Sequence, residues 1–572
     1  MLEVRERADP ALIARWRARV ARGRAHLGWS ESALAVRPHR GGTSLALAAP
    51  VDQLYTATEL NEWALCAALA EREPERSAAL EAALLAAALE NAADPASVVA
   101  PVIGEPAALA RLAVLAQAEA RPALAPLLAA ARARHLPFAL DEQCLTLGAG
   151  ARGRDYPLAA LPAAAAVEWA ALGDIPIALV TGSNGKTTTV RLIAACARAH
   201  GWRAGYNCTD GVFVDGERLA AGDYSGPAGA RLVLRDRRVA AAVLETARGG
   251  ILRRGIAVSQ ARVAIVTNVS SDHFGEYGID DLDGLADVKL AVASVVPPEG
   301  LLVLNAGDAL LRGRAGGLAQ RYGRAPPLGW FGADADAPML AAHRARGGGA
   351  AGVRAGRLVV AHAGAEHDLG AVAAMPIAVG GAARYNVENL AGAALAAVAL
   401  GIAPATIAAV FARFGADPAD NAGRLMRFKV GGVQVLVDYA HNPEGLTGLL
   451  SVAEALRGDG RLGLLLGHAG NRQDADLEAL ARVAAGFRPD LVVVKENESH
   501  LRGRAPGEIP RIIRTALLRA GMPEASLPVR GSEIEAARCA LEWARPGDTL
   551  ALLVHGAAAR SELLALLGVA IG

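Results

Sequence analysis

The sequence predicts an α/β protein built in three regions: a helix-rich α+β region over residues 1–170, a parallel sheet over 171–420, and a second parallel sheet over 421–572. Three observations lead to this prediction. The first region carries long runs of helix formers, the central region alternates short β-rich runs with helical segments, and the same alternation resumes near Asn421. Such alternation is typical of parallel sheets covered by helices. At 572 residues the chain is also too long for one hydrophobic core.

The composition is that of a globular protein and argues against several functional classes. Hydrophobic residues make up 53% and charged residues 20% of the chain, and 59 basic against 58 acidic residues leave no basic bias of the kind that nucleic-acid binding requires. The five cysteines show no CxxC spacing, so we expect neither a zinc site nor a disulfide framework, and reduced thiols fit the cytoplasm. We see no signal peptide and no apolar run long enough to span a membrane.

The first region is expected to be mainly helical. Residues 11–27 and 77–93 combine strong helix formers with apolar residues spaced near the helical repeat. A stretch rich in Gly, Arg and Pro at 148–162 predicts a linker to the central region.

Both α/β regions contain short apolar segments that predict strands. A Gly-dense stretch at 344–357 predicts a loop or short hairpin at the edge of the central region, and the helical stretch after each strand of the last region predicts a Rossmann-like layout. The predicted strands are 175–181, 239–245, 261–268 and 300–305 in the central region and 433–439, 462–467, 491–496 and 549–554 in the last.

The strongest local signal is TGSNGKTTT at 181–189, between a strand and a helix. Gly182 and Gly185 let the backbone N–H groups turn toward phosphate oxygens, Lys186 would reach the β- and γ-phosphates, and Thr187 would hold Mg²⁺. The pattern is G-x-x-G-K-T, shorter than the usual phosphate loop, and a plain glycine turn with an incidental lysine is the alternative. The predicted nucleotide-binding residues here are Gly182, Asn184, Gly185, Lys186, Thr187 and Thr188.

This loop resembles the G-T-N-G-K-T-[ST] loop of the Mur ligase family. Further stretches resemble family motifs in the same order: LETARGGIL (244–252), TNVSSDHFG (267–275), YNVEN (385–389), GRL (423–425) and DYAHNP (438–443). The resemblance runs from 171 to the end of the chain. It implies a P-loop-type central parallel-sheet domain followed by a Rossmann-like C-terminal domain, and an ATP-dependent ligase that forms amide bonds.

The resemblance also implies a catalytic set of Lys186, Glu245, His273 and Lys289. Glu245 matches the Mg²⁺-binding glutamate of the family and His273 its metal-linked histidine, so the implied metal ligands are Thr187, Glu245 and His273. Lys289 resembles the lysine that many members carbamylate. Each has a plainer alternative: a solvent-facing strand end for Glu245, a polar loop residue for His273, and a solvated helix face for Lys289.

Two pairs of residues match family positions near the nucleotide. Asn386 and Asn389 match the H-N-x-x-N motif near the adenine, although Tyr385 stands where the family has histidine. Arg424 and Asp438 match positions that reach the nucleotide when the C-terminal domain closes.

Five further residues are assigned to the substrates. Paired guanidinium groups suit a substrate carboxylate, although a solvated arginine-rich turn is the alternative. A turn role alone is the alternative for the DYAHNP histidine, and a loop-filling role for the histidine of GHAGN. The assigned residues are His441, Asn442, His468, Arg502 and Arg504.

A narrower resemblance is to the cyanophycin synthetases. It rests on LETARGGILRRG, GHAGNRQDAD and LRGRAPGEIP, and in the first region on YTATELNEWA (55–64) and LDEQCLTLGAGARGR (140–154). In that family an ATP-grasp domain follows the last of these segments, whereas here the phosphate loop follows closely. The family uses ATP-grasp to extend the Asp backbone and its Mur half to attach Arg, so this chain is expected to perform at most the second kind of reaction by itself.

The sequence therefore predicts an ADP-forming acid–amino-acid ligase that uses ATP and Mg²⁺. It would join an amino acid, with a basic one as a candidate, to a peptide or amino-acid-derived carboxylate through an acyl phosphate. We expect a cytoplasmic protein that binds neither nucleic acid nor membrane, and a homo-oligomer is a candidate assembly. Two alternatives stay open: a Mur-like ligase for a cell-wall precursor or folate, and a catalytically weak nucleotide-binding scaffold for a separate synthetase.

Overall fold

The structure is a computed structural model of the chain, and the chain divides into two compact units, each described by itself. The first unit comprises Met1–Leu147, Asp155–Ala171 and Phe274–Asp280, and the second Gly148–Arg154, Leu172–His273 and Asp281–Gly572. The residues that the structure describes are 2–4, 9–30, 32–39, 42–72, 77–90, 103–271, 274, 277–470, 472–497 and 500–568.

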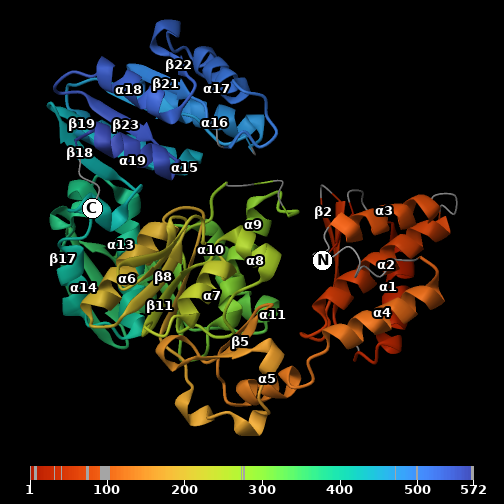
Figure 1. The fold of residues 1–572 in the computed structure, drawn as a ribbon. Helices are drawn as coiled ribbons and strands as arrows, with labels where there is room; N and C mark the ends of the chain where they lie inside the picture. Colours follow the sequence, from red (N-terminus) through yellow and green to blue (C-terminus); the bar gives the residue numbers. More distant parts are fainter. Residues whose placement is uncertain are drawn as a thin grey trace. The chain divides into compact units, whose positions relative to one another are not determined.

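The first unit packs helices against two small sheets, as expected of a helix-rich α+β region (Figure 1). Its core joins Trp16, Leu60 and Trp63, and the Trp16 indole donates a hydrogen bond to Asn61. The helices are α1 (Pro10–His26), α2 (Leu54–Arg72), α3 (Ser77–Glu90), α4 (Glu105–Glu119) and α5 (Leu124–Ala133). The sheets have the orders β1-β3-β2 (Leu2–Val4, Gly42–Leu47, Leu34–His39) and β4-β5-β6 (Phe138–Leu140, Cys144–Leu147, Arg154–Pro157).

The prediction of a linker at 148–162 is wrong, because this segment contains strand β6 of the second small sheet. Its glycines serve close backbone packing instead of flexibility. The φ angle of Gly150 is +50°, a Cβ there would lie 2.2 Å from the carbonyl oxygen of Val239, and Ala151 N donates to the same oxygen at 2.7 Å.

The second unit contains an eleven-stranded sheet of order β10-β9-β8-β11-β7-β12-β13-β14-β15-β16-β17. Strands β8, β11, β7, β12, β13, β14 and β15 run parallel, and two hairpins extend the edges. The predicted hairpin within 344–357 is confirmed as the turn between β15 and β16. The strands are β7 (Ile177–Thr181), β8 (Ala204–Cys208), β9 (Gly211–Val214), β10 (Glu217–Ala221), β11 (Ala241–Glu245), β12 (Val263–Val266), β13 (Leu301–Asn305), β14 (Leu328–Asp334), β15 (Gly349–Arg354), β16 (Arg357–His362) and β17 (Ala365–Ala371).

The central parallel strands are buried along their whole length, which explains their continuous apolar sequences. Helices α6 (Lys186–Ala199) and α13 (Arg384–Leu400) contribute to the same core, where Gly392 lets α13 approach Ile265 closely. The carboxyl ends of β7, β11 and β12 meet at one edge, and this edge positions the candidate site. The other helices are α7 (Pro227–Arg235), α8 (Arg248–Arg254), α9 (Leu282–Leu290), α10 (Ala309–Ala315), α11 (Leu318–Tyr322), α12 (Pro338–Ala345) and α14 (Pro404–Phe411).

A six-stranded C-terminal sheet follows, with the order β18-β19-β23-β20-β21-β22 and only β18 antiparallel. Helices α15, α16 and α17 contribute to one buried core and α18 and α19 to another, the two-sided arrangement of a Rossmann-like fold (Figure 1). The elements are β18 (Met426–Val430), β19 (Val433–Asp438), α15 (Pro443–Arg457), β20 (Leu462–Leu466), α16 (Asp474–Gly486), β21 (Leu491–Lys495), α17 (Glu508–Arg519), β22 (Val529–Arg530), α18 (Glu533–Trp543), β23 (Thr549–Leu553) and α19 (Ala557–Leu566).

The predicted fold class is confirmed: an α/β chain with a parallel central sheet, a Rossmann-like C-terminal sheet and a helical N-terminal region. Among the described residues, no helix has the length and apolar character that crossing a bilayer would require.

Candidate active site

The loop between β7 and α6 has a conformation that only glycine fits. Gly182 and Gly185 have φ angles of +147° and +80°. A Cβ on Gly182 would lie 1.8 Å from Thr267 Oγ1, and one on Gly185 would lie 2.2 Å from Asn389 Oδ1. Gly185 begins α6 without any side-chain cap, so the first N–H groups of this helix remain available to an anion.

The segment after β12 holds this loop in place. Asn184 N donates to Asn268 Oδ1 at 2.8 Å, Thr267 Oγ1 donates to the carbonyl oxygen of Asn184 at 2.5 Å, and Ser270 N donates to Ser183 Oγ at 3.0 Å. These bonds fix the loop before any ligand arrives, which is the condition for effective electrostatic stabilisation of a phosphate.

Replacing Gly185 with alanine should weaken nucleotide binding by at least about tenfold, because the added Cβ meets Asn389 as well as an unfavourable φ angle. Gly201→Ala is the matched control: Gly201 has a φ angle of +97°, but nothing lies within 4 Å of its added Cβ. Calorimetric titration with ADP measures both variants. Equal affinities in the two variants would contradict the assigned role of the loop.

Lys186, Thr187 and Glu245 lie together at the start of α6 and the end of β11. Lys186 Nζ donates to the carbonyl oxygen of Ser183 at 2.9 Å, and Thr187 Oγ1 donates to Glu245 Oε2 at 2.9 Å. Glu245 is 1% exposed, so the alternative of a solvent-facing strand end is wrong. Burial raises the pKa of Glu245, although Lys186, the Thr187 hydroxyl and Arg424 act against this.

The other carboxylate oxygen of Glu245 marks a place for a cation. Oε1 is buried and has no hydrogen-bond partner among the residues that the structure describes. A buried acceptor without a partner is costly unless a ligand satisfies it. In the described part of the chain no three His, Cys, Asp or Glu side chains gather as a metal cage. One carboxylate and one hydroxyl instead fit Mg²⁺, which commonly keeps water and nucleotide phosphates as its other ligands.

Two of the predicted catalytic residues need separate comment. His273 lies outside the described residues, so its predicted metal contact stays a prediction. Lys289, in the last turn of α9, is only 3% exposed, which rules out the alternative of a solvated helix face. Its carbamylation also stays a prediction.

The two asparagines of α13 lie beside the phosphate loop. Asn389 Nδ2 donates to Asn386 Oδ1 at 3.1 Å, and Asn386 Nδ2 donates to the carbonyl oxygen of Ile377 at 3.1 Å. Tyr385, in the place of the family histidine, packs against the core on the α15 side of the C-terminal sheet, where Gly448 leaves room for its ring.

Arg424 joins the start of the C-terminal sheet to the central one, whereas the hydrogen bonds of Asp438 stay within the C-terminal part. Arg424 Nη2 donates to Thr209 Oγ1 at 3.1 Å, and its guanidinium carbon lies 4.3 Å from the centre of the Tyr439 ring. Asp438 accepts hydrogen bonds from Leu425 N at 2.6 Å and Ala440 N at 2.7 Å. Arg424 therefore lies beside the phosphate loop, whereas both carboxylate oxygens of Asp438 already accept hydrogen bonds from backbone N–H groups.

The DYAHNP turn also reaches the loop. Asn442 Nδ2 donates to Asn184 Oδ1 at 2.9 Å, which places Asn442 at the nucleotide side of the site. His468 is 5% exposed, and its Nε2–H donates to the carbonyl oxygen of His441 at 2.7 Å while Ala469 N donates to its Nδ1 at 2.7 Å. Burial lowers the pKa of His468 to about 3, so this ring is neutral at pH 7 and holds the His441 turn.

The two predicted substrate arginines make no hydrogen bond or ion pair to the phosphate loop in the described part of the chain. Arg504 is paired with Glu508 at 2.7 Å and Asp474 at 2.7 Å, and it donates to the carbonyl oxygen of Arg472 at 2.6 Å. Arg502 is exposed and has a φ angle of +48°. Arg504 therefore joins the loops after β20 and β21, and substrate binding by either arginine stays a prediction.

Comparison with known proteins assigns this arrangement to a family. The model of the Mur ligase middle domain matches residues 180–397, and that of the Mur ligase glutamate ligase domain matches residues 423–557. The chain belongs to the Mur ligase family.

Relatives extend this assignment. Cyanophycin synthetase of Trichormus variabilis is 34% identical over 396 residues, which cover 69% of this chain and 43% of the relative. Cyanophycin synthetase of Synechocystis is 36% identical over 345 residues, which cover 60% of this chain and 38% of the relative. The chain therefore spans less than half the length of these relatives. A third relative is the UDP-N-acetylmuramoyl-L-alanyl-D-glutamate–2,6-diaminopimelate ligase of Corynebacterium efficiens. It is 28% identical over 401 residues, which cover 67% of this chain and 69% of the relative.

Solved structures show the same fold at low identity. E. coli FolC in complex with DHPP and ADP has a TM-score of 0.50 and 18% identity, covering 69% of this chain and 88% of FolC. Mycobacterium tuberculosis folylpolyglutamate synthase complexed with ADP has a TM-score of 0.50 and 18% identity, and the match covers 70% of this chain and 91% of the synthase.

Sequence reasoning missed a buried polar cluster in the C-terminal part of the chain. Lys495 at the end of β21 pairs with Glu533 at the start of α18, and Glu533 also accepts from His555 N at 2.9 Å and Gly556 N at 2.8 Å. His555 Nε2 lies 3.3 Å from the carbonyl oxygen of Ala440, and burial lowers the pKa of His555 to about 4. The cluster supports the DYAHNP turn. Its sequence signal was a lysine that ends an apolar strand.

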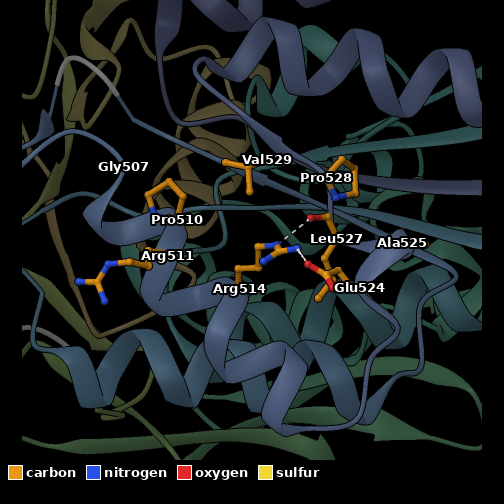
Figure 2. A pocket seen from close by; sticks show the side chains of 9 residues that line it. All are labelled: Gly507, Pro510, Arg511, Arg514, Glu524, Ala525, Leu527, Pro528 and Val529. Carbon is orange, nitrogen blue, oxygen red and sulfur yellow. Dashed lines mark hydrogen bonds and ion pairs between the residues drawn. The ribbon is translucent and has the colours of Figure 1, made fainter.

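A pocket lies at the start of α17, between this helix and residues 524–529 (Figure 2), and none of its lining residues belongs to the candidate site. Arg514 Nη2 donates to Glu524 Oε1 at 2.6 Å and Nε donates to the carbonyl oxygen of Leu527 at 3.3 Å, while Arg511 points away from this pair. Because Arg514 is paired inside the pocket, we assign it no catalytic role.

Proposed function

We propose that the protein is an ATP-dependent amide ligase that releases ADP and phosphate. The observation that carries this proposal is the buried Glu245 oxygen without a partner, beside Thr187 and the start of α6. An ordinary glycine turn needs no such carboxylate, whereas a nucleotide that brings a divalent cation does. Membership of the Mur ligase family and the similarity to the diaminopimelate ligase support it.

The chain's own residues have distinct tasks in this reaction. The loop N–H groups and the start of α6 bind the phosphates, and Lys186 neutralises charge on the β- and γ-oxygens. Thr187 and Glu245 would hold Mg²⁺, which supplies further charge neutralisation. Arg424 and Asn442 bring the C-terminal sheet to the loop, where water can be excluded from the reacting atoms.

A substrate carboxylate oxygen attacks the γ-phosphorus, the bond to the β–γ bridging oxygen breaks, and ADP leaves. The amine nitrogen then attacks the carbonyl carbon, phosphate leaves with the electrons of the carbon–oxygen bond, and the nitrogen loses a proton. Positioning and electrostatic stabilisation supply most of the catalysis in such transfers.

Similarity to cyanophycin synthetases supports amino-acid-derived substrates: an amino acid as the amine, basic or otherwise, and a peptide-like carboxylate. We extend the proposal to three domains, 1–170, 171–420 and 421–572, with the first holding the peptide chain, and to a cytoplasmic protein that can form homo-oligomers.

Incubation with ATP, Mg²⁺ and pooled carboxylates and amines tests the proposal. We expect ADP release that requires both substrates, together with a product whose mass equals the two substrates less one water. Omission of either substrate is the control. Nucleotide binding without turnover across a broad panel would overturn the proposal and favour a scaffold that serves a separate synthetase.

A further inference from the structure

The turn after β8 joins the phosphate loop to the C-terminal sheet. Its first residue, Thr209, lies with its Oγ1 3.2 Å from Thr187 Oγ1 and accepts a hydrogen bond from Arg424. Its second residue, Asp210, was not singled out in the sequence, and the proposed bond changes do not use it. The two residues nevertheless occupy the point where the two sheets of the second unit meet.

Asp210 is shared by arginines from two distant parts of the chain. Arg191, one turn after Thr187 on α6, donates through Nη2 to Asp210 Oδ2 at 2.8 Å. Arg560, on helix α19 of the C-terminal sheet, donates through Nη2 to Asp210 Oδ1 at 2.9 Å. One carboxylate therefore links the helix that begins at the phosphate loop to a helix that covers the C-terminal sheet.

The segment between the two sheets is bound into the same cluster. Arg191 Nη1 donates to the carbonyl oxygen of Ala422 at 2.8 Å. Gly423 follows with a φ angle of +74°, and a Cβ there would lie 2.5 Å from Arg560 Nη1, so glycine leaves the space that Arg560 occupies.

These ion pairs are largely buried, so breaking one is expected to disrupt the structure more than breaking a surface ion pair. The side chains of Arg191, Asp210 and Arg560 are 6%, 18% and 11% exposed. Burial works against the charge of Asp210, but Arg424, Arg191 and Arg560 outweigh it and hold the pKa of Asp210 below its usual value. Removing one charge from a buried, hydrogen-bonded pair is far more disruptive than removing one from an exposed pair.

We infer that Asp210 is a positioning residue that ties the C-terminal sheet to the phosphate loop, so that water is kept from the acyl phosphate until the amine attacks. This inference rests on the proposed function. If the tie is lost, water attacks the carbonyl carbon, and the products are the original carboxylate, phosphate and a proton in place of the amide. ATP is then consumed without ligation.

Asp210→Asn tests the inference, because the amide keeps the size of the side chain and removes its charge. We expect the yield of amide per ADP to fall by about tenfold, with amine-independent ADP release rising above that of the wild type. A purely structural role would lower both rates together. In an Arg560→Gln background, Asp210→Asn should have little further effect on the yield, since Arg560→Gln already breaks the link between α19 and the turn after β8.

Glu562→Gln is the matched control, since Glu562 lies on α19 with Arg560 but pairs with Arg538 of α18, and both side chains of this pair are 53% exposed. It should keep the wild-type yield. The thermal unfolding midpoint of each variant, measured beside the wild type, shows whether the fold is retained.

A second readout needs no turnover. With ADP bound, amide hydrogen exchange of residues 421–425 should be faster in Asp210→Asn than in the wild type. An unchanged amide-to-ADP yield together with unchanged exchange would overturn the inference. If the wild type releases no ADP with any substrate pair, the proposed function fails, while the exchange comparison still decides whether Asp210 holds the segment between the two sheets.

Discussion

Replacing Lys186 with alanine is expected to abolish ADP formation, with a loss of at least about 10³-fold in turnover. Lys186 is the first residue of α6 and lies within the phosphate loop. Its ammonium group is the mobile positive charge that can follow the γ-phosphate as that group moves to the carboxylate. Single-turnover ADP formation with saturating ATP and Mg²⁺ measures the loss.

Lys429→Ala controls for removal of a lysine, because Lys429 is exposed on β18. It should keep wild-type turnover. Since, among the residues that the structure describes, Lys186 donates a hydrogen bond only to the loop carbonyl of Ser183, its removal should leave the circular dichroism spectrum unchanged. ADP formation by Lys186→Ala at a rate near that of the wild type would remove the phosphate-loop assignment.

Where a conformation is determined by neighbouring residues, the sequence predicted it well. The phosphate loop depends on two positive φ angles at Gly182 and Gly185 and on the lysine and threonine that follow, all within one short stretch. The buried strands are likewise local, because an apolar run such as 462–467 with a helix after it has few other interpretations.

Contacts between distant segments could not be predicted in this way. Asp210 looks like an ordinary turn residue, and its importance appears only when Arg191 and Arg560 are brought to it. Lys495 reads as a solvated strand end, yet it is fully buried because Glu533 on α18 lies beside it. These pairings depend on the order of strands and helices in the sheet.

The mistaken linker has a different cause. Glycine is favoured both in flexible segments and where two backbones approach closely. At Gly150 the second reason applies, because the carbonyl oxygen of Val239 occupies the space of a side chain. Composition alone does not distinguish the two cases.

Glu245→Gln is the second change with a large expected effect. The amide oxygen can still accept the hydrogen bond from Thr187 Oγ1, so the main loss is the negative charge beside the cation site. ADP formation should fall by about 10²–10³-fold, the range typical of removing one preorganised electrostatic group. Removal of divalent cations with EDTA should have a comparable effect on the wild type and little further effect on the variant.

The pH dependence of Mg²⁺ binding separates this role from a structural one. Burial raises the pKa of Glu245 above its usual value, and a proton and Mg²⁺ compete for the same carboxylate. The affinity for Mg²⁺ in the presence of ADP should therefore be full above this raised pKa and fall as the pH drops through it. In Glu245→Gln the affinity should be lower and change little over the same range.

The stability of the metal-free protein should change in the opposite direction. A carboxyl whose pKa is higher in the folded than in the unfolded state favours folding below the unfolded pKa, and this stability is lost as the pH rises through the folded pKa. Unfolding by denaturant in EDTA should show this loss for the wild type and for the exposed control Glu299→Gln, but not for Glu245→Gln. Mg²⁺ with ADP should restore stability to the wild type and to Glu299→Gln, but not to Glu245→Gln. If Glu245→Gln shows the wild-type pH dependence of both Mg²⁺ binding and unfolding, Glu245 is not the carboxylate that holds the cation.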